Sequence, residues 1–369
     1  MKISSPTRLP PKRYTSQTGE RWLIEITTDG VELDLAGAVL DGEDFRGYGV
    51  YIHDCEGVVI RNGLIKGFHY GIRAERVKNL TISGCVVTEN YNPPGIGWLA
   101  DTARPETEGF GGGVYIRDGV GCVVENNEIG GNFNGLDLVH CTGGTVRANG
   151  ASGCGNVGIH LLDSGRNTIE GNRANRCIRH AGRFWNDTAD SAGILLEEYS
   201  HENRIVGNTM CYSGDGLFIR ANNRHSSNGN YVARNDGSFS PNNAFEAVFS
   251  EGNIFEDNTA DYSNYGFWLG YSRNTVLRNN RVRLNRLDGI AIEHGRDNTI
   301  ERNDIAGNRT GIRLWGDDRD HETDPSRDYR VSGNVITDSV EAAIRYSNTE
   351  GVLLEDNTFQ GNAEDVMEE

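Results

Sequence analysis

Residues 288–303 read DGIAIEHGRDNTIERN and hold two short strand patterns joined by a polar turn. In the first strand Ile290 and Ile292 fall on one side, because successive side chains of a strand alternate between its two faces. The second strand runs up to Asn303. Neither strand can bury its apolar side alone, so the stretch predicts a unit that stacks on further copies of itself.

The first strand pattern recurs along most of the chain, and each copy opens with a marker residue that is Gly or Ala. The markers are Gly49, Gly71, Gly113, Gly135, Gly158, Gly193, Gly216, Ala244, Gly266, Gly289, Gly311 and Ala343. Seven of the eleven steps between them are 22 or 23 residues long. The first and third residues after each marker are uncharged in every copy, as in Val50 and Ile52. This unbroken column is what the interior of a solenoid requires.

The second strand ends in Asn in almost every copy. These residues are Asn62, Asn127, Asn149, Asn172, Asn208, Asn235, Asn258, Asn279, Asn303, Asn334 and Asn357, with Cys85 in one copy. Asn tolerates left-handed backbone angles, and stacked Asn side chains bond to their neighbours above and below. The pattern predicts an asparagine ladder.

Short strands at this period, with no helical pattern between them, predict an all-β fold. We expect one right-handed parallel β-helix of about 12–13 coils, spaced by about 4.8 Å. Residues 26–360 would form the β-helix, residues 1–25 an irregular lead-in that caps it, and residues 361–369 an acidic tail. Leucine-rich repeats would need a different consensus, and propeller blades are about twice as long.

Composition restricts the partners of the chain. The formal charge of -17 over 369 residues argues against a nucleic-acid binder, since phosphate contacts need a basic face. No apolar run is long enough for a membrane span. The first residues lack the apolar core of a secretion signal, so we expect a cytoplasmic chain, or a periplasmic or secreted one in mature form.

The seven cysteines are expected to be reduced and buried. Their number is odd and no CxxC spacing occurs. Cys154 and Cys177 each follow a ladder Asn by five residues, which stacks them in adjacent coils. Small interior side chains are the favoured interpretation over a disulfide or a metal site.

The GIxL…NxIxxN unit resembles the right-handed β-helix repeat of the NosD-like and pectate-lyase-like superfamily over roughly residues 26–360. The resemblance implies one of several activities: polysaccharide lyase, glycoside hydrolase, uronate epimerase or accessory protein. The mannuronan epimerases of this superfamily carry a YG[FI]DPH motif. Here Tyr265-Gly266-Phe267 is followed by Trp268-Leu269-Gly270, so the Asp-Pro-His part is absent.

Four steps of the repeat are lengthened, and their positions select one face. Residues 91–112 and 179–190 precede a marker strand, whereas residues 221–229 and 316–328 follow one. Loops on both edges of one sheet would wall a groove along it. We therefore expect the site on the outer face of the marker strands, where residues two and four places after each marker point outward.

Five residues on this face are candidates for catalysis. They are Asp137, His160, Glu197, Arg220 and Glu246. Glu197 and Arg220 share a column in adjacent coils, and Glu246 lies diagonally one coil further. An Arg between two carboxylates would lower their proton affinity and clamp an anionic group. The alternative is an ordinary surface charge ladder.

Further residues on or beside this face are candidates for substrate binding. They are Phe218, His225, Trp268, Tyr271, Glu293, His294, Arg313 and Trp315. Flat rings exposed on a polar surface stack on sugar faces, although aromatic stacking between coils is an equal alternative. A second polar cluster of Asp137, His140 and Asp163 is the next choice.

No cofactor is expected. The acidic run at residues 317–322 offers oxygen ligands that suit calcium, yet it lacks the spacing of a calcium loop, and a solvated acidic loop is favoured. The sequence contains no HExxH, P-loop or GxSxG motif.

The main hypothesis is a carbohydrate-active enzyme that binds an oligosaccharide or polysaccharide along the marker strands. Hydrolysis by Glu197 and Glu246 is slightly preferred. A lyase or epimerase would use Arg220 or a His to take the proton beside a uronate carboxyl. The other class is a non-catalytic glycan-binding, adhesion or NosD-like accessory module. Metal delivery ranks last, because only three Met occur and the His are dispersed.

Overall fold

The computed structural model describes residues 1–16, 21–96, 110–179, 190–221, 225–316 and 326–369. Every regular element in these ranges is a β-strand, which confirms the all-β prediction. No helix with the length and hydropathy of a membrane span occurs in the described part of the chain. The chain divides into two units, Met1–Leu195 and Leu196–Glu369, and each is described by itself.

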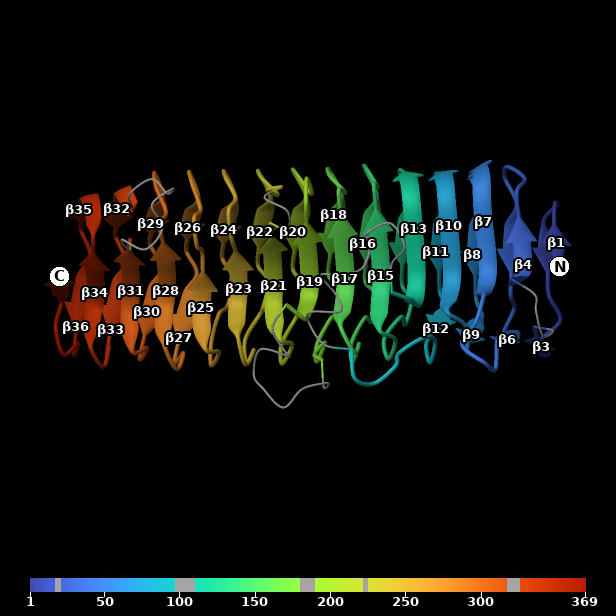
Figure 1. Cartoon of the computed structure of the whole chain (residues 1–369), viewed down its shortest axis with the longest axis horizontal. Coiled ribbons are helices and arrows are strands. Elements are labelled where there is room, and N and C mark those ends of the chain that lie inside the picture. The colour runs from blue at the N-terminus through green and yellow to red at the C-terminus, as the bar shows by residue number, and fades with distance from the viewer. Residues whose placement is uncertain (17–20, 97–109, 180–189, 222–224, 317–325) are drawn as a thin grey trace. The chain divides into compact units, whose positions relative to one another are not determined.

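The first unit is a stack of coils whose strands lie in three parallel sheets, and among the described residues only the first four coils place a strand in the third sheet (Figure 1). The first sheet holds β1 (Lys2–Ile3), β4 (Trp22–Ile26), β7 (Tyr48–Glu56), β10 (Tyr70–Lys78), β13 (Gly112–Val120), β15 (Asn134–Val139), β17 (Val157–Leu162) and β19 (Ala192–Glu197), which runs up to and past the boundary of the unit. The second holds β2 (Thr7–Arg8), β5 (Glu32–Asp34), β8 (Val59–Arg61), β11 (Thr81–Ser83), β14 (Val123–Glu125), β16 (Thr145–Arg147) and β18 (Thr168–Glu170). The third holds β3 (Arg13–Thr15), β6 (Val39–Asp41), β9 (Leu64–Lys66) and β12 (Val86–Val87).

The second unit repeats this plan. Its first sheet holds β21 (Asp215–Arg220), β23 (Asn243–Ala247), β25 (Tyr265–Trp268), β28 (Asp288–Glu293), β31 (Thr310–Trp315), β34 (Ala342–Ser347) and β37 (Val366–Glu368). Its second holds β20 (Arg204–Val206), β22 (Tyr231–Ala233), β24 (Ile254–Glu256), β26 (Val276–Arg278), β29 (Thr299–Glu301), β32 (Ser326–Ser332) and β35 (Thr349–Glu355). Its third holds β27 (Arg281–Arg283), β30 (Asp304–Ala306), β33 (Val335–Thr337) and β36 (Thr358–Gln360).

The coils number about 14, slightly more than the expected 12–13. Residues 1–25 are not an irregular lead-in, because β1 pairs in parallel with β4 and β3 with β6. The acidic tail also contributes a strand, since β37 pairs with β34. Both ends of the chain therefore continue the solenoid.

The core follows the predicted column. Ile290 is in register with Phe267 on one side and Ile312 on the other, and all three are fully buried. Close packing of the coils favours glycine at Gly135 and Gly289, although two other coils carry alanine at the marker. A Cβ added at Gly289 would lie 2.7 Å from the carbonyl oxygen of Gly311, and one at Gly135 would lie 2.5 Å from that of Gly158.

Asparagine side chains bond from coil to coil at the predicted turn. In the second unit Asn303 Oδ1 accepts the backbone N–H of Asn280 at 2.9 Å, and Asn303 Nδ2 donates to Asn334 Oδ1 at 3.0 Å. Asn280, rather than Asn279, holds the stacked position, because Asn279 takes the left-handed backbone just before it with φ of 55°. In the first unit the backbone N–H of Cys85 bonds to Asn127 Oδ1 at 2.9 Å.

All seven cysteines are thiols within the described ranges, and six of them are buried. The Cys177 thiol hydrogen-bonds to that of Cys154 and, with burial, raises the pKa of Cys154 well above its usual value. The two side chains thus stack in adjacent coils.

Candidate functional site

The outward face of the first sheet carries one row of five residues across successive coils of the first unit. Parallel register aligns Tyr51 with Arg73, Arg73 with Tyr115, Tyr115 with Asp137, and Asp137 with His160. Neighbours in this row are separated by the strand spacing of about 4.8 Å. The solenoid therefore brings two predicted residues, Asp137 and His160, into direct contact.

Asp137 and His160 form a hydrogen-bonded pair. His160 Nδ1 lies 3.0 Å from Asp137 Oδ1, and Asp137 is only 2% exposed. The carboxylate fixes one ring nitrogen, so Nε2 points away from Asp137. An imidazole oriented in this way is suited to proton transfer.

Two asparagines extend this pair toward the start of the strands. Asn134 Nδ2 donates to Asp137 Oδ1 at 2.8 Å, and Asn156 Nδ2 donates to Asn134 Oδ1 at 2.9 Å. Asp137 Oδ2 is buried and has no hydrogen-bond partner within the described ranges. Because an unpaired buried acceptor costs about 1–3 kcal/mol, this oxygen suits a donor from a bound molecule.

Arg73 is enclosed by aromatic rings. Its guanidinium lies 5.1 Å from the ring centroid of Tyr48, 5.6 Å from that of Tyr70 and 4.6 Å from that of Tyr115. Its Nε also donates to Glu75 at 2.7 Å. The charge of Arg73 is thus neutralised within the face, and Arg73 acts chiefly to hold the tyrosines.

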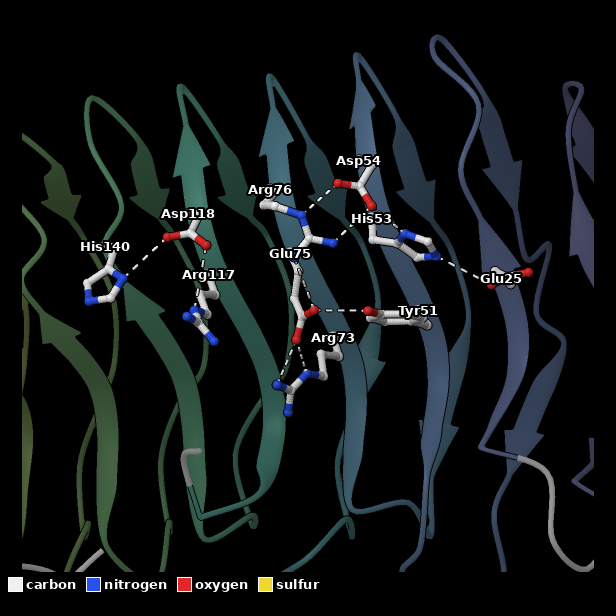
Figure 2. A network of polar contacts seen from close by, with 10 residues as sticks. All are labelled: Glu25, Tyr51, His53, Asp54, Arg73, Glu75, Arg76, Arg117, Asp118 and His140. Carbon is white, nitrogen blue, oxygen red and sulfur yellow. Dashed lines mark hydrogen bonds and ion pairs between the residues drawn. The ribbon is translucent and has the colours of Figure 1, made fainter. Parts of the chain in front are cut away.

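The network continues from Glu75 toward the amino terminus (Figure 2). Tyr51 donates to Glu75 at 2.9 Å, and burial together with this carboxylate raises the pKa of Tyr51 to about 12. The Tyr51 ring stacks on His53 with centroids 4.5 Å apart. His53 contacts Asp54 through Nδ1 at 2.8 Å and Glu25 through Nε2 at 3.3 Å.

The expected cluster of Asp137, His140 and Asp163 is divided. His140 lies at the turn after β15 with φ of 52°, where its Nδ1 is 3.3 Å from Asp118 and its Nε2 3.8 Å from Asp163. Asp137 bonds instead to Asn134 and His160. Asp118 also lies 3.6 Å from Arg117, whose guanidinium projects over the face in Figure 2.

The second unit contains the other predicted catalytic group. Arg220 Nε donates to Glu197 at 2.6 Å, and the two residues are 8% and 7% exposed. Glu246 lies opposite Phe218 in register and accepts a hydrogen bond from Asn243 Nδ2. The backbone N–H of Asn243 is itself held by Asp215 Oδ1 at 3.0 Å.

Several predicted binding residues also meet in the second unit. The rings of Trp268 and Trp315 lie 5.5 Å apart at 62°, and Arg313 stacks over Trp315 at 4.4 Å. Trp315 Nε1 donates to Glu293 at 3.2 Å. These residues form an aromatic and charged surface across β25, β28 and β31.

A second aromatic column borders this surface. The Tyr271 ring stacks between Phe249, at 4.4 Å, and His294, at 5.0 Å. His225 stacks on Tyr199 at 4.5 Å, and its Nδ1 is 3.5 Å from Glu198, so it lies beside the end of β19.

Two of the predicted binding residues are buried. Phe218 was expected to offer its ring to a sugar, but only 3% of the residue is exposed. His294 is also buried, at 7%. The acidic run at residues 317–322 and most of the predicted wall loops lie outside the described residues.

Sequence reasoning missed the network at Tyr51, Arg73 and Tyr115, because it concentrated on the middle of the chain. The signal was present, since these residues stand two places after Gly49, Gly71 and Gly113. Applying the same offset to the first coils would have found them.

Two family models match the chain. The right-handed beta helix region matches residues 26–209 and 106–243. The periplasmic copper-binding protein (NosD) matches residues 240–369. No curated protein matches the chain.

Solved structures with the same fold have low sequence identity. A variant of the periplasmic alginate epimerase AlgG gives a TM-score of 0.57 at 15% identity, over 95% of this chain and 79% of that one. The Dettilon tailspike protein gives a TM-score of 0.50 at 15% identity, over 97% of this chain and 60% of that one. This likeness supports the parallel β-helix architecture.

The described residues do not fit the copper named in one family description. Copper sites draw on His, Cys and Met. All seven cysteines precede residue 240. The described His and Met of the matched segment are His294, directly after β28, and Met367, in β37, so they lie in different coils. Within the described ranges no group of three or more His, Cys, Asp or Glu side chains could hold a metal ion.

Proposed function

Because the chain belongs to the right-handed β-helix family, we propose that it acts on an oligosaccharide or polysaccharide bound across the outward face of the first sheet. The observation that carries this proposal is the hydrogen-bonded pair of buried Asp137 and half-buried His160. A solved β-helix protein that is named as an alginate epimerase supports a glycan as the substrate. Periplasmic proteins are named both there and in the NosD description, which supports action outside the cytoplasm.

The chemistry that best suits this pair is proton abstraction beside a uronate carboxyl group. His160 Nε2 would take the proton from the carbon next to the carboxylate, and Asp137 would stabilise the imidazolium that forms. Arg117 supplies positive charge on the same face for the developing enolate, and it stands two coils from His160. Return of a proton from water on the opposite side gives epimerisation. Departure of the oxygen on the adjacent carbon, which takes the proton held by His160, gives an unsaturated product and a new chain end.

Hydrolysis by Glu197 and Glu246 is the second candidate. The amide of Asn243 positions Glu246, and the ion pair with Arg220 favours the charged form of Glu197. In this scheme Glu197 is the base that activates water, and Glu246 is the acid that protonates the leaving oxygen. The aromatic surface of Trp268 and Trp315 would hold the neighbouring sugar rings.

A panel of polysaccharides distinguishes these reactions. The chain would be incubated with alginate, polygalacturonate and a neutral β-glucan. Ultraviolet absorbance detects unsaturated uronates, a reducing-end assay detects hydrolysis, and proton NMR detects epimerised residues. We expect a uronate product that His160→Ala abolishes and that Glu246→Gln leaves in place.

Other results select the alternatives. Reducing ends without unsaturation, lost in Glu246→Gln, would assign hydrolysis and overturn the role of His160. Glycan binding that His160→Ala and Glu246→Gln leave intact, with no turnover by any form, would assign a binding module.

A further inference from the structure

A cavity of about 420 Å³ lies in the first unit, outside the row that contains Asp137 and His160. Pro93, Pro94, Ile96 and Phe133 give it an apolar wall, and Gly153 and Gly155, on either side of Cys154, present backbone without a side chain. Its volume falls within the range of small-ligand sites, about 300–1,000 Å³.

The cavity adjoins the strands that carry the proposed reactive pair. Phe133 immediately precedes the first residue of β15, and Gly155 stands two residues before the first residue of β17. His160 follows Gly155 by five residues, which span at most about 17 Å because Gly155 and Asn156 lie in a bend before β17. The cavity thus lies at the edge of the same face, within reach of a glycan chain that also occupies His160.

A chain of hydrogen bonds joins the edge of the cavity to His160. A carboxylate only accepts, so Asn134 must present Nδ2 to Asp137 and Oδ1 to Asn156. Each hydrogen bond in this chain is therefore donated toward Asp137. Asn156, which directly follows Gly155 of the lining, is the first donor of the chain. Its Oδ1 is buried without a hydrogen-bond partner in the described part of the chain.

We propose that this cavity is a distal subsite. It binds one sugar unit of the same glycan, a few sugar units along the chain from the unit at His160. A sugar ring has an apolar face for Pro93, Pro94 and Phe133, and a rim of hydroxyls for the exposed backbone. The inference rests on the proposed function. It adds that the protein selects long chains over short ones.

A cavity-filling variant, Gly153→Asn, tests the subsite. Gly153 has φ of 70°, and a Cβ added there meets nothing within 4 Å. Asn tolerates this left-handed backbone better than other side chains, so the fold should be retained while the new side chain occupies part of the cavity. The matched control is Gly171→Asn, because Gly171 has φ of 62° and equally open surroundings but does not line the cavity.

The measurement is kcat/KM on a disaccharide and on an octasaccharide of mannuronate or galacturonate. In the wild type we expect the octasaccharide to be preferred. In Gly153→Asn the ratio of octasaccharide to disaccharide should fall by about tenfold, which is about 1.4 kcal/mol of binding, and in Gly171→Asn it should not change. An unchanged ratio in Gly153→Asn, or an equal fall in both variants, would overturn the subsite.

Calorimetric binding of the octasaccharide separates this proposal from the catalytic one. In the His160→Ala background, Gly153→Asn should weaken binding about tenfold, and Gly171→Asn should leave binding intact. This result supports the subsite even where His160→Ala retains turnover and the proposed reaction fails. Equal affinity in all three proteins overturns the subsite, whether or not turnover depends on His160.

Discussion

Single side chains on the outward face differ in function according to how they are held. Asp137 is buried and shares one oxygen between Asn134 and His160, whereas Arg73 is neutralised by Glu75 and covered by tyrosine rings. Asp137 keeps the His160 ring oriented for proton transfer. Arg73 and the tyrosine rings around it form a packed surface on the same face. Reactivity is therefore expected at Asp137 and His160.

Replacing Asp137 by Asn tests the orientation of His160. The amide keeps the size of the side chain but no longer stabilises an imidazolium, so kcat on the uronate substrate should fall by about 100-fold or more. Asp163→Asn is the control, because Asp163 contacts His140 at the turn. Equal losses in the two variants would argue against a specific role for Asp137.

Tyr51 gives a spectroscopic test of the network in Figure 2. Its pKa is raised to about 12 by burial and by Glu75, so the protonated phenol is favoured in the folded chain. Its stabilising contribution is complete below the usual value near 10 and is lost as pH rises through about 12. The ultraviolet absorbance of the wild type and of Tyr51→Phe would be followed as pH rises. The difference between the two curves should show one phenol ionising near pH 12. A difference spectrum with a midpoint near 10 would contradict this burial.

At the scale of the element, the coil is stabilised by its turns as well as by its apolar column. Asn303 accepts from the backbone N–H and side chain of Asn280 and donates to Leu277 O and Asn334 Oδ1, all between 2.9 and 3.0 Å. Each of these groups is buried, so its partner cannot be replaced by water.

Asn303→Ala should lower the free energy of unfolding of the second unit by about 2–4 kcal/mol, because it removes the acceptor of the Asn280 N–H and the side-chain donor to the Leu277 carbonyl. The measurement is the midpoint and slope of urea denaturation followed by circular dichroism. Asn357→Ala is the comparison, since Asn357 is half-buried in the outermost coil and should lose less. A larger loss at Asn357 would contradict the ladder account.

The elements were predictable where they repeat. The offset from each marker gave the inward residues and put Asp137 and His160 on the outward face. Their contact was not predicted, because Asp137 was grouped with His140 and Asp163, although parallel register sets Asp137 opposite His160. The strands before residue 26 were missed, since Pro6, Pro10 and Pro11 interrupt the alternation and the strands β1 and β2 have two residues each. The burial of Phe218 also could not be predicted, because exposure depends on neighbours that lie in other coils.

At the scale of the whole molecule, a solenoid has no single centre that holds it together. Each coil contacts only the coils before and after it, so stability is the sum of local terms and nearest-neighbour interfaces. The cysteines are distributed over several coils, from Cys55 to Cys211. Burial is the main cause that raises the pKa of the Cys55, Cys85 and Cys122 thiols to about 11.

Thiol reactivity should therefore report the opening of coils. A raised pKa means that the folded chain holds these thiols protonated, and the thiolate is the reactive form. At neutral pH iodoacetamide should leave the native chain nearly unmodified, and in denaturant all seven cysteines should react. Mass-spectrometric mapping at intermediate urea should find Cys55 modified before Cys122 and Cys141, because β7 lies nearer the end of the first sheet. Simultaneous modification of all three would instead show that the first unit unfolds as one cooperative block.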